Sequence, residues 1–282
     1  MLPPQAETLI RLALEEDLAY GDVTAEAVFP STHTSRAFIE ARQDLVVCGV
    51  DVAMAVFRRL DPGLRLDPIA VEGSRVEAGH QILGLRGTTR SILAGERTAL
   101  NFLQRLSGIA TASHRYAQRI RELGVSTRIA DTRKTTPGWR ALEKYAVRVG
   151  GCVNHRFSLG EHVMIKDNHI AAAGSIRQAV DLCRARCPHT AKIEVEVNTL
   201  AQVWDALSAK AEVIMLDNME PHEIDDAVAM IKRRAIVEVS GGVTLNTLAE
   251  FARPGVDVIS IGALTHSAKA ADLSLTIEPA TA

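Results

Sequence analysis

The stretch Asp131-Thr132-Arg133-Lys134-Thr135-Thr136-Pro137-Gly138 directly follows the apolar run Arg128-Ile129-Ala130. An apolar run that ends in consecutive cations and hydroxyls and then in a Pro-Gly turn is typical of a buried strand that leads into a functional loop. A half-buried edge strand would instead alternate polar and apolar residues. Because core packing gives no reason for two adjacent cations, Arg133 and Lys134 predict an anion at the end of this strand.

Five later segments repeat this pattern of an apolar run followed by a residue that a pure core would not choose. With the first, they occupy residues 127–130, 162–165, 192–197, 212–216, 235–239 and 257–261, and helical segments lie between them. They close on Asp131, on Lys166, on Glu196, on Asp217, on Ser240 with Gly241 and Gly242, and on Gly262. Functional groups at the carboxyl ends of parallel strands are typical of an α/β barrel. Six strands instead of eight predict an incomplete barrel.

The first hundred residues show an α+β pattern. Periodicity predicts helices over 6–18 and 51–60, and short β-like runs occupy 36–41, 45–48 and 64–71. A further helix is predicted over 91–106 that stops at Gly108, followed by a second over 109–123. The glycine turns between 71 and 83 resemble those of lipoyl-type modules, but no lysine occupies a turn tip, which argues against a carrier role.

The alternating tail, residues 272–277, predicts an extra strand after the barrel. We expect it to return to the N-terminal domain. The predicted fold class is therefore α/β, with an N-terminal α/β sandwich domain (1–108), the barrel domain with the active site (109–266) and a C-terminal segment that rejoins the first domain (267–282).

Length and composition narrow the class of protein. The chain has 282 residues, of which 47% are hydrophobic and 23% charged, so it can bury a sizeable core. A net charge of −2 provides no general basic field for nucleic acid or an anionic membrane, so anions must be bound by local clusters. The start of the chain lacks the pattern of a signal peptide, and no apolar run reaches about 18 residues. We expect a cytoplasmic protein.

The four cysteines are too sparse for a disulfide framework, which fits a reducing compartment. Cys183, Cys187 and His189 lie close enough in sequence to suggest zinc. Since no fourth ligand is in reach, we favour helix packing for these residues.

Glycine motifs follow the last two predicted barrel strands, as Ser240-Gly241-Gly242 and Gly262-Ala263. Loops after the final strands of barrels often bind phosphate through backbone N–H groups, and glycine lets that backbone approach closely. The alternative for either motif alone is a tight strand-to-helix turn. Because the two occur together, we favour a phosphate site.

Two successive loops are dense in cationic groups, namely Arg133, Lys134, His155, Arg156 and Lys166. Guanidinium groups grip carboxylates or phosphates through two parallel hydrogen bonds, and lysines act as point charges. The alternative is a solvated basic surface, but such surfaces usually interleave Glu and Asp rather than Gly, Asn and Pro. His155 on its own would be read as a structural histidine. Together the five residues predict that several anionic groups are bound at once.

Glu196 and Asp217 end neighbouring strands and place two carboxylates at this positive mouth. Carboxylates beside substrate phosphates commonly hold Mg²⁺, which is the predicted cofactor. A catalytic base and an ion pair with Lys134 or Lys166 remain open alternatives.

Six motifs carry a family resemblance that covers nearly the whole chain. They are Glu96-Arg97-Thr98-Ala99-Leu100-Asn101, the stretch from Asp131 to Gly138, Asn154-His155-Arg156, Lys166-Asp167-Asn168-His169, Leu216-Asp217-Asn218 and Glu238-Val239-Ser240-Gly241-Gly242. Together they resemble the quinolinate phosphoribosyltransferase family. The resemblance implies a Mg²⁺-dependent enzyme of NAD biosynthesis that uses quinolinate and phosphoribosyl pyrophosphate and acts as a homodimer with shared active sites.

The resemblance also implies roles for individual residues. Arg133, His155, Arg156 and Lys166 would bind the two carboxylates of quinolinate, with Arg97 reaching in from the neighbouring subunit. Lys134 would lie between quinolinate and the ribosyl donor, and Thr132 of the same motif is expected to contact substrate. Glu196 and Asp217 would hold the ribose hydroxyls and Mg²⁺, and Ser240, Gly241, Gly242, Gly262, Ala263 and His266 would take the 5′-phosphate. The residues expected to be catalytic are Lys134, Lys166, Glu196 and Asp217.

The chain departs from the family pattern at two positions. Cys152 stands where a third glycine usually precedes the Asn-His-Arg motif, and Trp139 replaces a smaller aliphatic residue. Neither position carries a charge needed for binding, so we expect changes in loop detail. Two alternatives stay open: a relative such as the ModD protein of molybdenum-transport operons, which lacks the Lys-Asp-Asn-His motif, and a non-catalytic barrel that binds a phosphate ligand.

Overall fold

The computed structural model describes residues 3–278, which form two compact units. The first unit contains the chain up to His114, the segment Thr135–Gly151 and the chain from Ala263 onward. The second contains Arg115–Lys134 and Cys152–Gly262. Both units are thus built from segments that are far apart in sequence.

The first unit contains a four-stranded antiparallel sheet in the order β12-β1-β5-β3. Its strands are β1 (Thr34–Ala41), β3 (Arg65–Pro68), β5 (Gln81–Thr88) and β12 (Leu273–Ile277), and the short strands β2 (Leu45–Val46) and β4 (Arg75–Val76) form a separate pair. The strand predicted in the tail is confirmed as β12, which pairs with β1 through Ala37 opposite Ile277. The C-terminal tail therefore completes the N-terminal sheet.

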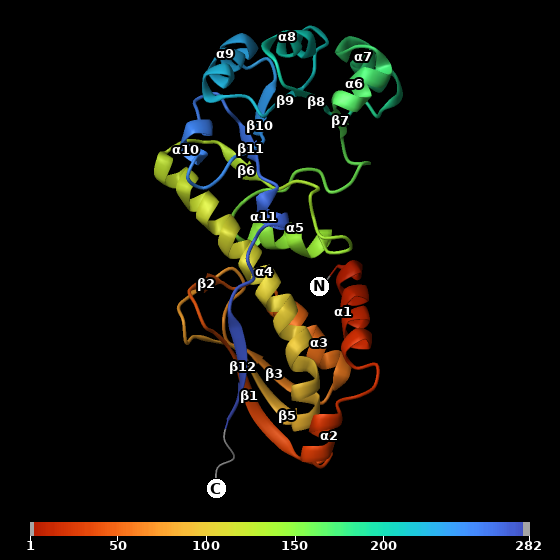
Figure 1. Cartoon of the computed structure of the whole chain (residues 1–282), viewed down its shortest axis with the longest axis vertical. Helices are drawn as coiled ribbons and strands as arrows, with labels where there is room; N and C mark the ends of the chain where they lie inside the picture. The colour runs from red at the N-terminus through yellow and green to blue at the C-terminus, as the bar shows by residue number, and fades with distance from the viewer. Residues whose placement is uncertain (1–2, 279–282) are drawn as a thin grey trace. The chain divides into compact units, whose positions relative to one another are not determined.

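The helices of this unit are α1 (Pro4–Asp17), α2 (Val23–Val28), α3 (Val50–Leu60), α5 (Arg140–Val149), α11 (Ala263–His266) and most of α4 (Thr89–Leu123). Figure 1 shows α3 and the first half of α4 lying along one face of the sheet. The core-facing side of α3 is apolar, with Val52, Val56 and Phe57 buried. The predicted α/β sandwich is confirmed as this layer of helices on a sheet.

The predicted helix break at Gly108 is wrong, because α4 runs without interruption from Thr89 to Leu123. Gly108 has a packing reason instead. A Cβ atom built at this position would lie 2.1 Å from the backbone oxygen of Lys269, so only glycine lets the C-terminal segment cross the helix here. Glycine is typical both of a helix end and of a close approach between two backbones, so the sequence alone does not distinguish the two.

The second unit is built on a six-stranded parallel sheet in the order β6-β11-β10-β9-β8-β7. Its strands are β6 (Arg128–Ala130), β7 (Val163–Ile165), β8 (Ile193–Val197), β9 (Val213–Asp217), β10 (Ile236–Ser240) and β11 (Val258–Ser260). Each coincides with a predicted run. Around it lie α6 (Asp167–Ala173), α7 (Ile176–Arg186), α8 (Leu200–Ser208), α9 (Pro221–Ile231) and α10 (Leu248–Phe251). Figure 1 shows α7, α8 and α9 on the outer side of the strands.

The strand order is that of a barrel that does not close. Successive strands β7 to β11 are neighbours, and β11 then pairs with β6, the first strand in the chain. The described residues contain no ladder between β6 and β7; the edge of β6 instead makes one isolated bridge, from Ala130 to Val153. The predicted incomplete α/β barrel is confirmed.

No helix within residues 3–278 is both long enough and apolar enough to cross a membrane. Cys183 lies in α7 and Cys187 caps its C-terminus. Over the same residues, the one group whose side chains are close enough to bind a metal ion contains neither cysteine. Helix packing is therefore the better account of these two residues.

Candidate active site

The carboxyl ends of the six barrel strands carry most of the residues predicted from the sequence. Arg133 and Lys134 follow β6, and Lys166 follows β7. Asp217 and Ser240 are the last residues of β9 and β10, and Glu196 is the second-to-last residue of β8. Because the strands are parallel, all these ends face the same edge of the sheet. Arg97, Ala263 and His266 belong to the first unit, where Ala263 begins α11 and His266 ends it.

Asp131 fixes the loop that carries the second group of cations. Its carboxylate is fully buried and accepts hydrogen bonds from Asn154 Nδ2 at 2.6 Å and from the backbone N–H of His155 at 2.9 Å. These contacts hold the Asn154-His155-Arg156 motif against the end of β6. The sequence placed Asp131 at a strand end but did not predict this positioning role.

Two arginines from different loops lie close together in this unit. Arg156 is 8% exposed and donates from its guanidinium to the carbonyl oxygen of His162 at 3.3 Å. Burial and the nearby positive charge of Arg133 lower the pKa of Arg156. Two guanidinium groups that repel each other in a partly buried place are stabilised when an anion binds between them, and an anion is the ligand that the sequence predicts for this loop.

His155 is held by two buried carboxylates that the sequence analysis missed. Its Nε2 lies 3.4 Å from a carboxylate oxygen of Glu194 and 3.4 Å from one of Glu238. Glu194 also contacts His162 Nε2, at 2.9 Å. Burial alone would lower the pKa of His155, but its hydrogen bonds to the two glutamates raise that pKa to about 9. The interior of the barrel thus contains a connected polar network.

A signal for this network was present in the strands. In Ile193-Glu194-Val195-Glu196-Val197 the two glutamates alternate with apolar residues, so they share one face of β8. Glu238 shares a face with Ser240 on β10 in the same way. A period of two therefore pointed to Glu194 and Glu238 as inward-facing partners of the residues at the mouth.

The same histidines and Glu194 are the group close enough to bind a metal, with their ligand atoms within 4.8 Å of one another. The backbone N–H of Arg156, however, donates to His155 Nδ1 at 2.8 Å. With Nδ1 accepting, Nε2 carries the proton of the ring and donates to Glu194 at 3.4 Å. Since a metal ligand needs a free lone pair, this group is better described as a hydrogen-bond network.

Lys166 and Glu196 form an ion pair between the ends of β7 and β8. The Lys-Asp-Asn-His motif explains the position of the lysine, because His169 Nδ1 accepts from the backbone N–H of Lys166 at 3.0 Å and so caps α6. The ion pair was one of the alternatives left open by the sequence, and it is present here.

Asp217 ends β9 next to Glu196, as predicted. The register places Glu196 opposite Met215, which shares a strand face with Asp217, so both carboxylates lie on the same side of the sheet. Asn218 Nδ2 donates to Asp217 at 2.7 Å. Two carboxylates on adjacent strand ends offer the hard oxygen ligands that Mg²⁺ prefers.

The glycine turn after β10 is tightly packed against the end of β9. Gly241 and Gly242 have φ values of 99° and 65°, in the left-handed region. A Cβ atom at Gly241 would lie 2.1 Å from Asn218 Oδ1, whereas nothing lies within 4 Å of one at Gly242. Open space over Gly242 leaves its backbone accessible to a ligand, as a phosphate site requires.

Other predicted residues have local partners. The hydroxyl of Thr132 accepts from the backbone N–H of Lys134 at 3.0 Å and so shapes the loop after β6. In the first unit, His266 Nδ1 lies 2.6 Å from Ser267 Oγ at the end of α11, and Arg97 lines a cavity of about 320 Å³ with Leu12 and Trp139.

The two departures from the family pattern are both accommodated by packing. Trp139 stacks on Phe102, with ring centroids 4.8 Å apart. Cys152 is buried, and burial together with the charge of Asp131 raises the pKa of its thiol to about 12. The thiol is therefore neutral and fills space, which agrees with an effect on the loop alone.

An open barrel with cations, carboxylates and glycine turns gathered at its strand ends defines a barrel protein whose mouth binds small anionic ligands. The chain belongs to the quinolinate phosphoribosyl transferase family: the model of the C-terminal domain matches residues 109–276, and that of the N-terminal domain matches residues 22–107.

Named relatives match over almost the whole chain. A probable nicotinate-nucleotide pyrophosphorylase (carboxylating) of Methanocaldococcus jannaschii is 40% identical, over 98% of this chain and 99% of its own length. The nicotinate-nucleotide pyrophosphorylase (carboxylating) of Mycobacterium leprae is 42% identical over 96% of both chains. The crystal structure of NadC from Streptococcus pyogenes has a TM-score of 0.92 and 39% identity, and the match covers 99% of both chains.

Proposed function

We propose that this chain transfers the phosphoribosyl group of phosphoribosyl pyrophosphate to quinolinate and decarboxylates the product, as a pentosyltransferase of NAD biosynthesis. The products are nicotinate mononucleotide, pyrophosphate and CO₂. The observation that carries the proposal is the pair of close arginines, Arg133 and Arg156, in the same barrel as the strand-end group Lys166, Glu196 and Asp217. The names of the two relatives described above, both nicotinate-nucleotide pyrophosphorylases, support it.

Quinolinate carries two carboxylates on adjacent ring carbons, so its site needs several positive charges at short range. We assign this role to Arg133, Arg156, Lys166 and His155. The buried Asp131 and Glu194 hold the backbone and ring of His155, so this residue loses little freedom when substrate binds. Lys134 is assigned to the space between quinolinate and the ribosyl donor.

Phosphoribosyl pyrophosphate is assigned to the other side of the mouth. Glu196 and Asp217 accept hydrogen bonds from the ribose hydroxyls, and the backbone at Ser240, Gly241 and Gly242 with Gly262, Ala263 and His266 takes the 5′-phosphate. The accessible backbone at Gly242 supports this assignment. When ribose binds, Glu196 exchanges part of its ion pair with Lys166 for hydroxyl groups, which leaves the lysine available to a substrate carboxylate.

The charges fit the bonds that break. Loss of pyrophosphate from ribose C1 develops positive charge on the sugar, which the carboxylates of Glu196 and Asp217 stabilise, and negative charge on the leaving group, which cations stabilise. The quinolinate nitrogen forms the bond to C1. The positive ring nitrogen then stabilises the electron pair left on the adjacent ring carbon when its carboxylate leaves as CO₂, and that carbon takes up a proton to give nicotinate mononucleotide. The protein mainly orients the reactants and shields them from water.

The carboxylates of Glu196 and Asp217 also fit Mg²⁺ as hard oxygen donors on neighbouring strands. When bound, Mg²⁺ supplies charge neutralisation for the pyrophosphate group. We also propose a cytoplasmic enzyme that acts as a homodimer, in which Arg97 completes the quinolinate site of the partner. Support for this role comes from the position of Arg97 in a cavity on the first unit, beside Leu12, which is 49% exposed.

The test is to incubate the purified protein with quinolinate, phosphoribosyl pyrophosphate and Mg²⁺ and to measure both CO₂ and nicotinate mononucleotide. The expected result is equal amounts of both products, no reaction without Mg²⁺, and no product when nicotinate replaces quinolinate. Binding of both substrates without turnover would favour the non-catalytic barrel. A product from another base in place of quinolinate would favour a relative of different specificity.

A further inference from the structure

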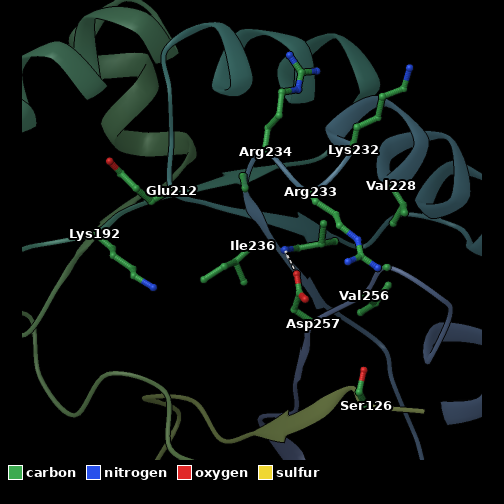
Figure 2. A pocket seen from close by; sticks show the side chains of 13 residues that line it. Ser126, Lys192, Glu212, Val228, Lys232, Arg233, Arg234, Ile236, Val256 and Asp257 are labelled. Carbon is green, nitrogen blue, oxygen red and sulfur yellow. Dashed lines mark hydrogen bonds between the residues drawn. The ribbon is translucent and has the colours of Figure 1, made fainter. Parts of the chain in front are cut away.

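A second large cavity lies at the opposite end of the barrel strands from the candidate active site. Its volume is about 800 Å³, and it is formed where β8, β10 and β11 begin and just before β6 (Figure 2). Lys192 precedes β8 and Asp257 precedes β11, whereas the active-site residues of the same sheet follow or end their strands. The cavity is therefore separate from the mouth.

The side chains that line this cavity carry an excess of positive charge. Four are cationic, Lys192, Lys232, Arg233 and Arg234, and two are acidic, Glu212 and Asp257. Both acidic groups have structural partners. Glu212 pairs with Arg184 at 2.8 Å and accepts from the backbone N–H of Ile193 at 2.9 Å, and Asp257 accepts from the backbone N–H of Val237 at 2.8 Å.

Two of the cations face the cavity. In Figure 2, the side chains of Lys192 and Arg233 extend into the space between the strand ends, while those of Lys232 and Arg234 extend away from it. The guanidinium of Arg234 donates to the carbonyl oxygen of Met230 at 2.7 Å, at the end of α9. Within the described part of the chain, neither Lys192 nor Arg233 forms an ion pair or a side-chain hydrogen bond. Their charges are thus available to a ligand.

The backbone that presents Arg233 is in a costly conformation. Lys232 and Arg233 have φ values of 48° and 60°, so two consecutive residues with side chains occupy the left-handed region that favours glycine. Helices often end with one such residue, but the second is unusual. The strain is maintained at a position whose side chain is exposed and forms no ion pair or side-chain hydrogen bond within the described residues, which is typical of functional positions.

The cavity also has apolar walls, formed by Val228, Ile236 and Val256. A cavity of this volume that combines an apolar wall with a few directed polar groups is typical of small-molecule sites. From these features together we infer that this cavity binds a nucleotide-sized phosphorylated ligand, with its phosphates on Lys192 and Arg233 and its base or other flat group against the apolar wall.

The test measures the affinity of the full-length protein for ADP and for inorganic phosphate by isothermal titration calorimetry. ADP is expected to bind saturably and more tightly than phosphate. Lys192→Gln and Arg233→Gln should each weaken ADP binding by about tenfold, because each removes one charge-assisted contact to phosphate. The matched control is Lys210→Gln, since Lys210 is also exposed, also has a left-handed φ of 60° and also precedes a barrel strand, but does not line the cavity.

A second variant tests the cavity without changing its charge. Ser126 is exposed at the rim, so Ser126→Trp should fill the entrance and abolish ADP binding. The inference is overturned if ADP binds the Lys192→Gln/Arg233→Gln double variant as tightly as the natural protein, if Ser126→Trp leaves binding unchanged, or if ADP binds no more tightly than phosphate. Since turnover of quinolinate is not part of the readout, this result is independent of the proposed activity.

Discussion

At the scale of single residues, two buried carboxylates position the cations of the site without contacting a substrate themselves. Asp131 holds the backbone of His155, and Glu194 holds its ring. Both are buried, so each is stable as an anion only because hydrogen-bond donors surround it. They convert a loop of cations into a preorganised site, and their contribution is to position other groups.

The first prediction at this scale concerns pH and stability. Burial alone would raise the pKa of Glu194, but hydrogen bonds from His155 and His162 lower it below the ordinary 4.5. Because the folded-state pKa is the lower one, the stabilisation is present above about pH 4.5 and is lost as pH falls through the folded value. Glu194→Gln should therefore reduce the free energy of unfolding by roughly 1–3 kcal/mol at pH 7, and the difference should shrink below pH 4.5. Urea titrations at several pH values measure this, and a pH-independent difference would refute it.

The side chain of Lys166 is expected to be needed for turnover. Replacing it by alanine removes the partner of Glu196 and a cation assigned to quinolinate, so turnover should fall by roughly 100-fold or more. Arg133→Ala and Lys134→Ala should lose most turnover for the same electrostatic reason. Steady-state kinetics at saturating substrates are the measurement. Arg177→Ala, which breaks an exposed ion pair with Asp181, is the control and should leave turnover unchanged. Near-normal turnover in Lys166→Ala would refute the proposed role of this lysine in turnover.

At the scale of elements, the six strands of the barrel place chemistry by their direction. Most residues of these short strands are buried, and the polar residues of the site end or follow the strands at the common edge. The long helix α4 is shaped by a close packing contact, because the backbone at Lys269 crosses its centre. Gly108 therefore allows the segment that leads into β12 to pack closely against α4.

This crossing gives a prediction in which packing opposes helix propensity. Alanine favours a helix interior over glycine by about 1 kcal/mol. Gly108→Ala should nevertheless destabilise the protein, by roughly 1–3 kcal/mol, because its Cβ would meet the Lys269 carbonyl. Thermal or chemical unfolding measures this, with the exposed Gln118→Ala on the same helix as a control that stays within about 0.5 kcal/mol. A more stable Gly108→Ala protein would show that the two segments separate easily.

At the scale of the whole molecule, each of the two units is built from segments that alternate along the chain. The segment Thr135–Gly151 follows a barrel strand but belongs to the first unit. Its buried Glu143 shows why, since it pairs with Arg105 of α4 at 2.8 Å and accepts from the hydroxyl of Thr136 at 2.8 Å. Because Arg105 belongs to the first unit, this buried ion pair ties the segment to that unit.

The proposed homodimer predicts complementation between two inactive variants. If Arg97 acts on the partner's site, then Arg97→Ala and Lys166→Ala each inactivate every site of their own dimers. A mixed dimer would contain one intact site and one site with both changes. Refolding an equal mixture should restore about a quarter of natural turnover, since half the dimers are mixed. Analytical ultracentrifugation checks the dimer itself, and no recovered turnover from mixed dimers would place Arg97 in its own subunit's site.

The sequence by itself determined the six barrel strands, the residues at their ends, the tail strand and the family. These features are written in local patterns, because periodicity, turn chemistry and motif spacing act over a few residues. Only the tertiary structure decided that Gly108 lies inside a helix, that Asp131 and Glu194 hold His155, and that Thr135–Gly151 joins the first unit. Each of these depends on which distant segments meet, and a contact between residues far apart leaves no periodic signal in either segment.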